Sequence, residues 1–164
     1  MFRSFLLGAI AGARSMTPLA AVSDAANRRT LPANHGGPRG LGHPIIAAGT
    51  KALAAGELAG DKMDSAPDRI VAPGIAARVV TGAIVGASIA PREQRILAAL
   101  LGIAGAVSAA YTTFDLRMRA IRRFGQTPTG LVEDALVLGA THFTIKGATL
   151  PPAEPAAAPA PQPA

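Results

Sequence analysis

The sequence contains no cysteine, no tryptophan and a single tyrosine. Without cysteine the chain can form no disulfide, no thiolate nucleophile and no cysteine-based metal site. The three histidines, His35, His43 and His142, lack the spacing of metal ligands, and no Ser-His-Asp order or nucleotide motif is present. We therefore expect no metal, no cofactor and no enzymatic activity. The lack of tryptophan also removes most of the aromatic belt that usually marks membrane interfaces.

Charged residues are scarce as well. They make up 16% of the chain, whereas soluble domains usually contain about 25%. Hydrophobic residues reach 49%, the mean hydropathy is +0.32, and alanine and glycine dominate the apolar share. Small residues suit helices that pack closely in lipid. With 164 residues, the chain is long enough for one domain, and its composition predicts a membrane protein.

Apolar segments recur along the chain at lengths near the roughly 20 residues that cross a bilayer. They cover residues 3–23, 44–60, 70–91, 96–114 and 131–145. The fourth has neither a charge nor a polar face, which argues against a surface helix of a soluble bundle. The second is the weakest, because it is short and contains Lys51 and Glu57. The predicted fold is an all-α polytopic membrane bundle of four to five short Ala/Gly-rich segments.

The predicted domain boundaries follow from this pattern. Residues 1–148 form the membrane helical domain, and residues 149–164 form a disordered Pro/Ala-rich tail. One alternative is that residues 1–13 are a signal peptide and the remainder is a secreted helical domain. We favour a first membrane segment, which Pro18 kinks because it lacks an N–H and frees the carbonyl of Arg14. A simpler alternative is that this helix ends near Met16 and Arg14 snorkels to the interface.

The arginines and lysines should set the orientation in the membrane. If all five segments cross, one side carries Arg3, Lys62, Arg69, Arg117, Arg119, Arg122 and Arg123, and the other carries Arg28, Arg29, Arg39, Arg92, Arg95 and Lys146. The two sets are nearly equal. This balance suggests that one segment does not cross, or that the protein inserts both ways. Residues 44–60 are the segment that we most expect not to cross.

Polar residues within or beside the apolar segments are the candidate site, since charge at membrane depth is costly and usually functional. They are Arg14, Ser15, Thr17, Glu57, Asp61, Lys62, Arg78, Asp115, Glu133 and Asp134. We expect Arg78 to pair with Glu133 or Asp134 if their segments pack together. Arg14, Ser15 and Thr17 could instead hold an anion such as a phosphate or a lipid headgroup.

Pairs of glycines at four-residue spacing predict close helix contacts. They are Gly8 and Gly12, Gly56 and Gly60, and Gly82 and Gly86. The residues around the first pair recur around the third, so the sequence of 8–13 resembles that of 82–87. Internal repeats are common in transporters, where binding sites lie at the repeat interface. Helices rich in alanine and glycine also resemble one another by composition alone.

Four stretches together resemble a family of small bacterial membrane proteins, domain of unknown function four-one-two-six. They are GARSMTPLA (12–20), GELAGDKMDSAPDR (56–69), PGIAARVVTGAIVGA (73–87) and LVEDALVLGA (131–140). The resemblance covers residues 2–146. It implies an integral inner-membrane protein without assigned catalytic residues.

Two classes of function remain open. One is a small transporter, channel or lipid-handling protein with a charged intramembrane site. The other is a non-catalytic scaffold or assembly subunit whose buried charges are structural ion pairs. In either case we expect a multi-pass protein of the bacterial inner membrane that contacts lipid, forms homo-oligomers and binds no nucleic acid. The substrate cannot be deduced from the residues.

Overall fold

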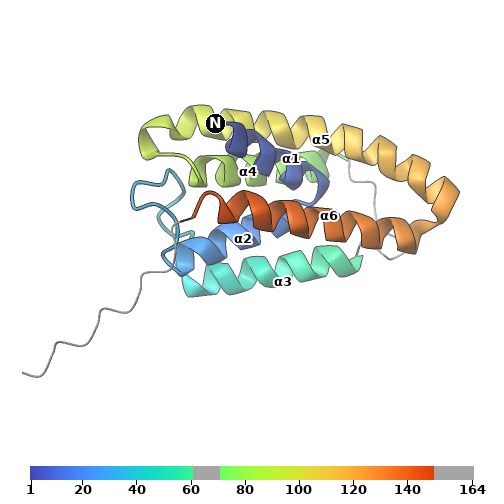
Figure 1. Cartoon of the computed structure of the whole chain (residues 1–164), viewed down its shortest axis with the longest axis horizontal. Coiled ribbons are helices and arrows are strands. Elements are labelled where there is room, and N and C mark those ends of the chain that lie inside the picture. The colour runs from blue at the N-terminus through green and yellow to red at the C-terminus, as the bar shows by residue number, and fades with distance from the viewer. Residues whose placement is uncertain (61–70, 150–164) are drawn as a thin grey trace, which may run out of the picture.

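A computed structural model describes residues 1–60 and 71–149 of the chain. The helices are α1 (Phe2–Ala13), α2 (Met16–Asn27), α3 (Pro44–Gly60), α4 (Ala72–Ser88), the short 3₁₀ helix η1 (Arg92–Gln94), α5 (Arg95–Phe124) and α6 (Gln126–Lys146). They pack side by side as an elongated bundle (Figure 1). No strand occurs in the two described ranges, and the predicted all-α class is confirmed there. The predicted tail beyond Thr149 lies outside them.

Within these ranges one helical stretch, Arg92–Phe124, is long and apolar enough to cross a membrane. Helices α1 and α4 are apolar but shorter. Large apolar side chains nevertheless cover much of the surface: Phe2, Ile45 and Phe143 are 75%, 73% and 77% exposed. Soluble monomers rarely expose extended apolar surface, which usually marks an interface with a partner or with lipid.

Helices α1 and α4 pack on α5 through glycines. A Cβ atom built on Gly8 would lie 2.1 Å from the carbonyl oxygen of Gly102, and one on Gly82 would lie 2.8 Å from the same atom. Gly12 and Gly86 meet α5 one turn away, at Ala106 and Ala98 respectively. Side chains at these four positions would force the helices apart.

The two similar stretches lie against the same part of α5, around Gly102. Along α1 the contacts on α5 advance toward its C-terminus, and along α4 they run the other way. The two similar stretches thus belong to one helix parallel and one antiparallel to α5. The other predicted pair differs, because a Cβ on Gly56 or Gly60 of α3 would meet no described atom within 4 Å.

Helices α1 and α2 form a V-shaped hairpin rather than one kinked helix. Arg3, near the start of α1, donates to the carbonyl of Gly147 just beyond α6. Near the end of α2, Arg28 lines a cavity together with Lys146. The outer ends of both helices therefore lie beside the same end of α6, and the apex at Arg14 lies deeper in the bundle (Figure 1).

This hairpin corrects the expectation that residues 3–23 form one segment that crosses the bundle. Residues 44–60, which were expected to be the weakest spanning segment, form the continuous helix α3 of 17 residues. Helices α3 to α6 run between two ends of the bundle. We call the end with the N-terminus, residues 28–43, η1 and residues 147–149 the loop end. The connection at Gly125, where φ is 85°, lies at the turn end.

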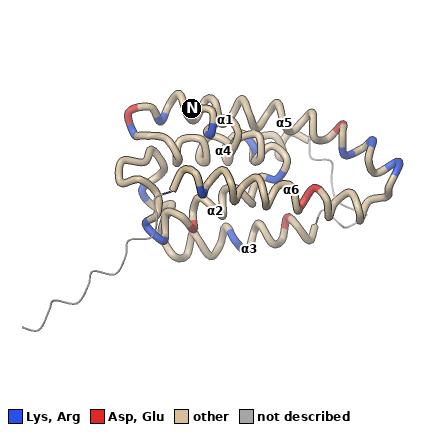
Figure 2. The backbone as a smooth tube through the Cα atoms, viewed as in Figure 1, with Lys and Arg blue, Asp and Glu red and all other residues tan. Residues whose placement is uncertain are grey.

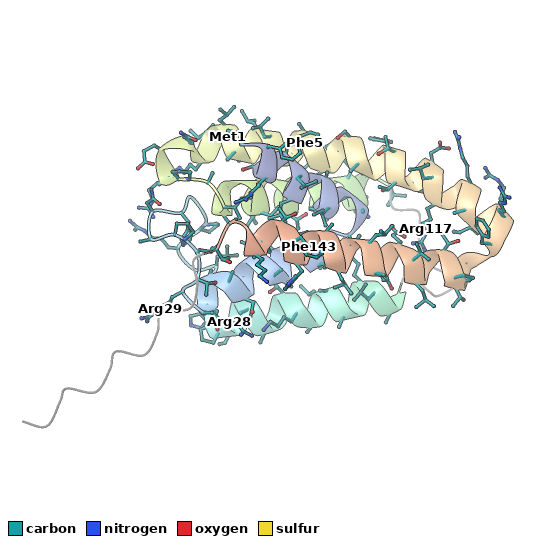
Figure 3. All side chains as sticks on the ribbon, viewed as in Figure 1. Met1, Phe5, Arg28, Arg29, Arg117 and Phe143 are labelled. Carbon is teal, nitrogen blue, oxygen red and sulfur yellow. The ribbon has the colours of Figure 1, made fainter. Side chains whose placement is uncertain are left out.

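Charged residues lie at both ends of the bundle and also along its middle (Figure 2). Arg28 and Arg29 lie at the loop end, whereas Arg117 lies toward the turn end (Figure 3). Helix α5 has 30 residues and is about 45 Å long, so its last turns extend beyond the shorter helices.

Candidate functional site

The break between α1 and α2 leaves two sets of backbone groups without partners inside their own helices. Helix α1 ends at Ala13, and Arg14 adopts an extended conformation with φ −142° and ψ 112°. Helix α2 begins at Met16, and Pro18 occupies its first turn, where the missing N–H costs no hydrogen bond. Carbonyls at the end of α1 and amides at the start of α2 therefore need partners from elsewhere.

Glu57 of α3 supplies the partner for the start of α2. The backbone N–H of Ser15 and that of Met16 each donate to its carboxylate at 2.9 Å. The hydroxyl of Ser15 donates to the same carboxylate, also at 2.9 Å. A negative group here also complements the positive end of the α2 dipole. Glu57 thus caps a helix to which it does not belong.

Arg78 of α4 donates a hydrogen bond to a free carbonyl at the end of α1. Its Nε donates to the carbonyl of Gly12 at 2.9 Å, and its Nη1 donates to Gly74 in its own helix at 2.9 Å. The residue is 5% exposed. A cation at a helix C-terminus is favourable because the free carbonyls carry partial negative charge. The two broken helix ends are therefore met by opposite charges from two other helices.

Arg14, which lies between α1 and α2 at the apex of the hairpin, contacts two other helices. Its side chain is fully buried and forms an ion pair with Asp134 of α6, which is 7% exposed. It also donates to the backbone carbonyl of Glu57 at 3.2 Å. The simpler expectation that Arg14 snorkels to an interface is therefore wrong. We call Arg14, Ser15, Glu57, Arg78 and Asp134 the charged centre.

Five of the predicted site residues thus meet at the hairpin apex, but others do not. Glu133 forms an ion pair with Arg117 of α5 at 2.5 Å. Asp115 pairs with Arg119 at 2.6 Å on the exposed part of α5, one turn along the same helix. Asp61 and Lys62 fall outside the described residues.

A groove lies between α2, α3 and α6, and Thr17, two residues after Ser15 of the charged centre, lines it. It encloses about 410 Å³, is mostly apolar, and ends at Thr17 in the first turn of α2. Thr17 and Thr141 line it, and their hydroxyls are buried without a hydrogen-bond partner within the described part of the chain. Buried hydroxyls without protein partners usually bind water or a ligand. Thr17, one of the predicted residues, therefore belongs to the groove.

The groove continues toward the loop end. An adjoining cavity of about 510 Å³ shares Asp24 and His142 with it and reaches Arg28 and Lys146. Lys51 of α3 bonds to Asp24 at 2.5 Å where the two spaces meet. Positive side chains thus line the cavity nearer the loop end, and mostly apolar side chains line the groove.

The sequence alone did not identify three residues that line the groove. Thr141 looks like any small residue of an apolar segment, and Asp24 and Lys51 are far apart in sequence. Arg117 was considered only as one of the cations that should set the orientation in the membrane. Thr141 follows Asp134 by two turns and lies on the same face of α6, and this spacing was the one pattern that could have identified it.

Comparison of the chain with protein families, with curated proteins and with solved structures finds no match. The resemblance to domain of unknown function four-one-two-six stays a prediction. The function must therefore be inferred from the geometry.

Proposed function

We propose that the protein is a multi-pass protein of the bacterial inner membrane, with α3 to α6 crossing the bilayer and α1–α2 as a re-entrant hairpin. The support is the apolar surface of the bundle and the position of the hairpin apex. Helix α6 spans about 31 Å, close to the thickness of the hydrocarbon core. Homo-oligomers would use open small-residue surface such as that at Gly56 and Gly60 of α3.

Within this arrangement we assign the charged centre to a small transporter, channel or lipid-handling protein. The observation that carries this assignment is that the groove ends at Thr17, beside the helix start that Glu57 caps. Broken helices whose ends face an ion or an anionic group form the binding sites of many transporters. The donors that hold Glu57 are two amides and one hydroxyl, which would bind a phosphate or another carboxylate equally well.

The alternative is a membrane scaffold without transport, in which the charged centre locks the helices together. The complete burial of Arg14 favours it, because a buried ion pair can serve structure alone. The two functions differ in one respect that can be measured. A transport site must be reached by water from one side, whereas a structural centre need not be.

Single cysteines distinguish these functions, since the chain has none of its own. Thr141 and Thr144 are both buried on α6, but Thr144 donates to the carbonyl of Ala140 at 2.7 Å and does not line the groove. In vesicles, Thr141→Cys should react with a small water-soluble thiosulfonate much faster than Thr144→Cys. Equal, slow labelling of both would reject the transport assignment in favour of the scaffold.

A further inference from the structure

A second pocket lies at the loop end, away from the charged centre. It encloses about 470 Å³ between residues 36–39, the last turns of α4 and the start of α5. Arg39, Arg92 and Arg95 line it from three different elements. Its floor is formed by Ala83, Ile84 and Ala87. The pocket therefore combines three cations with an apolar base.

Backbone contacts hold these arginines together. The N–H of Gly36 donates to Ala90 at 2.8 Å, and the N–H of Arg92 donates to Asn34 at 2.8 Å. A Cβ atom on Gly36 would lie 2.6 Å from the Cβ of Arg95, so only glycine allows the loop to approach α5 this closely. The pocket is thus a fixed part of the fold and not a chance meeting of surface side chains.

The three guanidinium groups differ from those of four other arginines. Arg14, Arg28, Arg117 and Arg119 each form an ion pair with a carboxylate. Among the described residues, no ion pair or side-chain hydrogen bond involves the guanidinium groups that line the pocket. Like charges gathered without a counter-ion repel one another, so an anion at this point would be favourable.

His35 lies next to the pocket, and its imidazole is affected by the charge of Arg92. Burial, and then the positive charge of Arg92, lower the pKa of its imidazole. The ring is therefore neutral at pH 7, and its Nδ1 accepts the N–H of Gly37 at 3.2 Å. The positive potential of the pocket thus comes from the arginines alone.

The pocket opens along an apolar face of α4. Residues 76, 80, 83 and 87 follow one another at helical spacing, and Val80 on this face is 57% exposed. A chain of methylene groups lying on this face would have its polar end at the arginines.

We propose that this pocket binds a phosphate group, carried either by an anionic phospholipid or by free phosphate. Guanidinium groups present paired N–H donors that match phosphate oxygens. The apolar floor and the α4 face would accommodate the acyl chain of a lipid. The site is separate from the charged centre and does not require that centre to transport anything.

The test measures binding of phosphatidylglycerol and of inorganic phosphate to the purified full chain in detergent, by native mass spectrometry and calorimetry. The triple variant Arg39→Gln/Arg92→Gln/Arg95→Gln should weaken binding by about fivefold for each arginine, since each basic residue near an anionic lipid contributes a similar factor. The control Arg119→Gln/Arg122→Gln/Arg123→Gln removes the same charge at the turn end. It should bind as the unmodified chain does.

A second variant distinguishes binding in the pocket from attraction by the overall positive charge of the protein. Ala83→Trp fills the floor and keeps all three arginines, so it should weaken phosphatidylglycerol binding while the net charge is unchanged. Retained phosphatidylglycerol that phosphate displaces would identify a lipid headgroup site. Phosphate binding without retained lipid would identify a free-phosphate site. Equal losses in the two triple variants, or no binding of either probe by the unmodified chain, would overturn the proposal.

Discussion

The side chain of Arg14 shows how the charged centre depends on single residues. It is fully buried, and its charge is met by Asp134 and by the backbone of Glu57. A buried cation is tolerated only with such partners, because its desolvation costs several kcal/mol. By contrast, Asp115 pairs with Arg119 where their side chains are 58% and 68% exposed. The same type of ion pair therefore has different energetic consequences at the two places.

We expect Asp134→Asn to lower the free energy of unfolding by about 3 kcal/mol, because it leaves a buried guanidinium without its anion. The control Asp115→Asn should change it by less than about 1 kcal/mol, since exposed pairs contribute little. Chemical unfolding in detergent micelles measures both. Similar losses in the two variants would show that Arg14 does not depend on Asp134.

Sequence reasoning identified these residues but not all of their partners. It expected Glu133 or Asp134 to pair with Arg78, whereas the structure pairs Asp134 with Arg14 and Glu133 with Arg117. The pairing depends on which face each helix turns toward its neighbours, and the centre combines the break between α1 and α2 with residues of α3, α4 and α6. Spacing along one segment does not contain that information. The capping of α2 by Glu57 was missed for the same reason.

At the scale of the helices, glycine contacts could be predicted where they join helices within the chain. Gly8 and Gly82 both face Gly102 of α5, which itself belongs to no predicted pair. The predicted contact at Gly56 and Gly60 is not seen among the described residues, because α3 packs mainly on α2. A four-residue spacing thus indicates that a close approach is possible. It does not say which helix approaches.

Two glycines in the middle of helices should respond to the same substitution in opposite ways. A methyl group on Gly102 would lie 2.1 Å from the carbonyl oxygen of Gly82, so Gly102→Ala should destabilise the bundle by about 2 kcal/mol through overpacking. A methyl group on Gly139 meets nothing within 4 Å, so Gly139→Ala should stabilise α6 by roughly 0.8 kcal/mol. Thermal unfolding in detergent compares them. A gain in both variants would contradict the close packing of α1, α4 and α5.

For the whole molecule, the central feature is the hairpin that returns α2 to the end where α1 begins. Pro18 and the polar residues around it predicted an interruption, and the interruption is present. The return could not be predicted, because it depends on contacts such as that between Arg3 and Gly147, which lie at opposite ends of the described chain. The near balance of arginines and lysines led us to expect one segment that does not cross, and this expectation stays a prediction. It could not say which one.

The most direct test labels single cysteines with an impermeant thiol reagent in spheroplasts and in inverted membrane vesicles. The positions are Phe2, Ala33 and Gln94 at the loop end and Thr127 at the turn end, all exposed. We predict that Phe2→Cys, Ala33→Cys and Gln94→Cys label from one side of the membrane, and Thr127→Cys from the other. Labelling of Phe2→Cys and Ala33→Cys from opposite sides would mean that the first segment crosses, and would contradict the re-entrant hairpin.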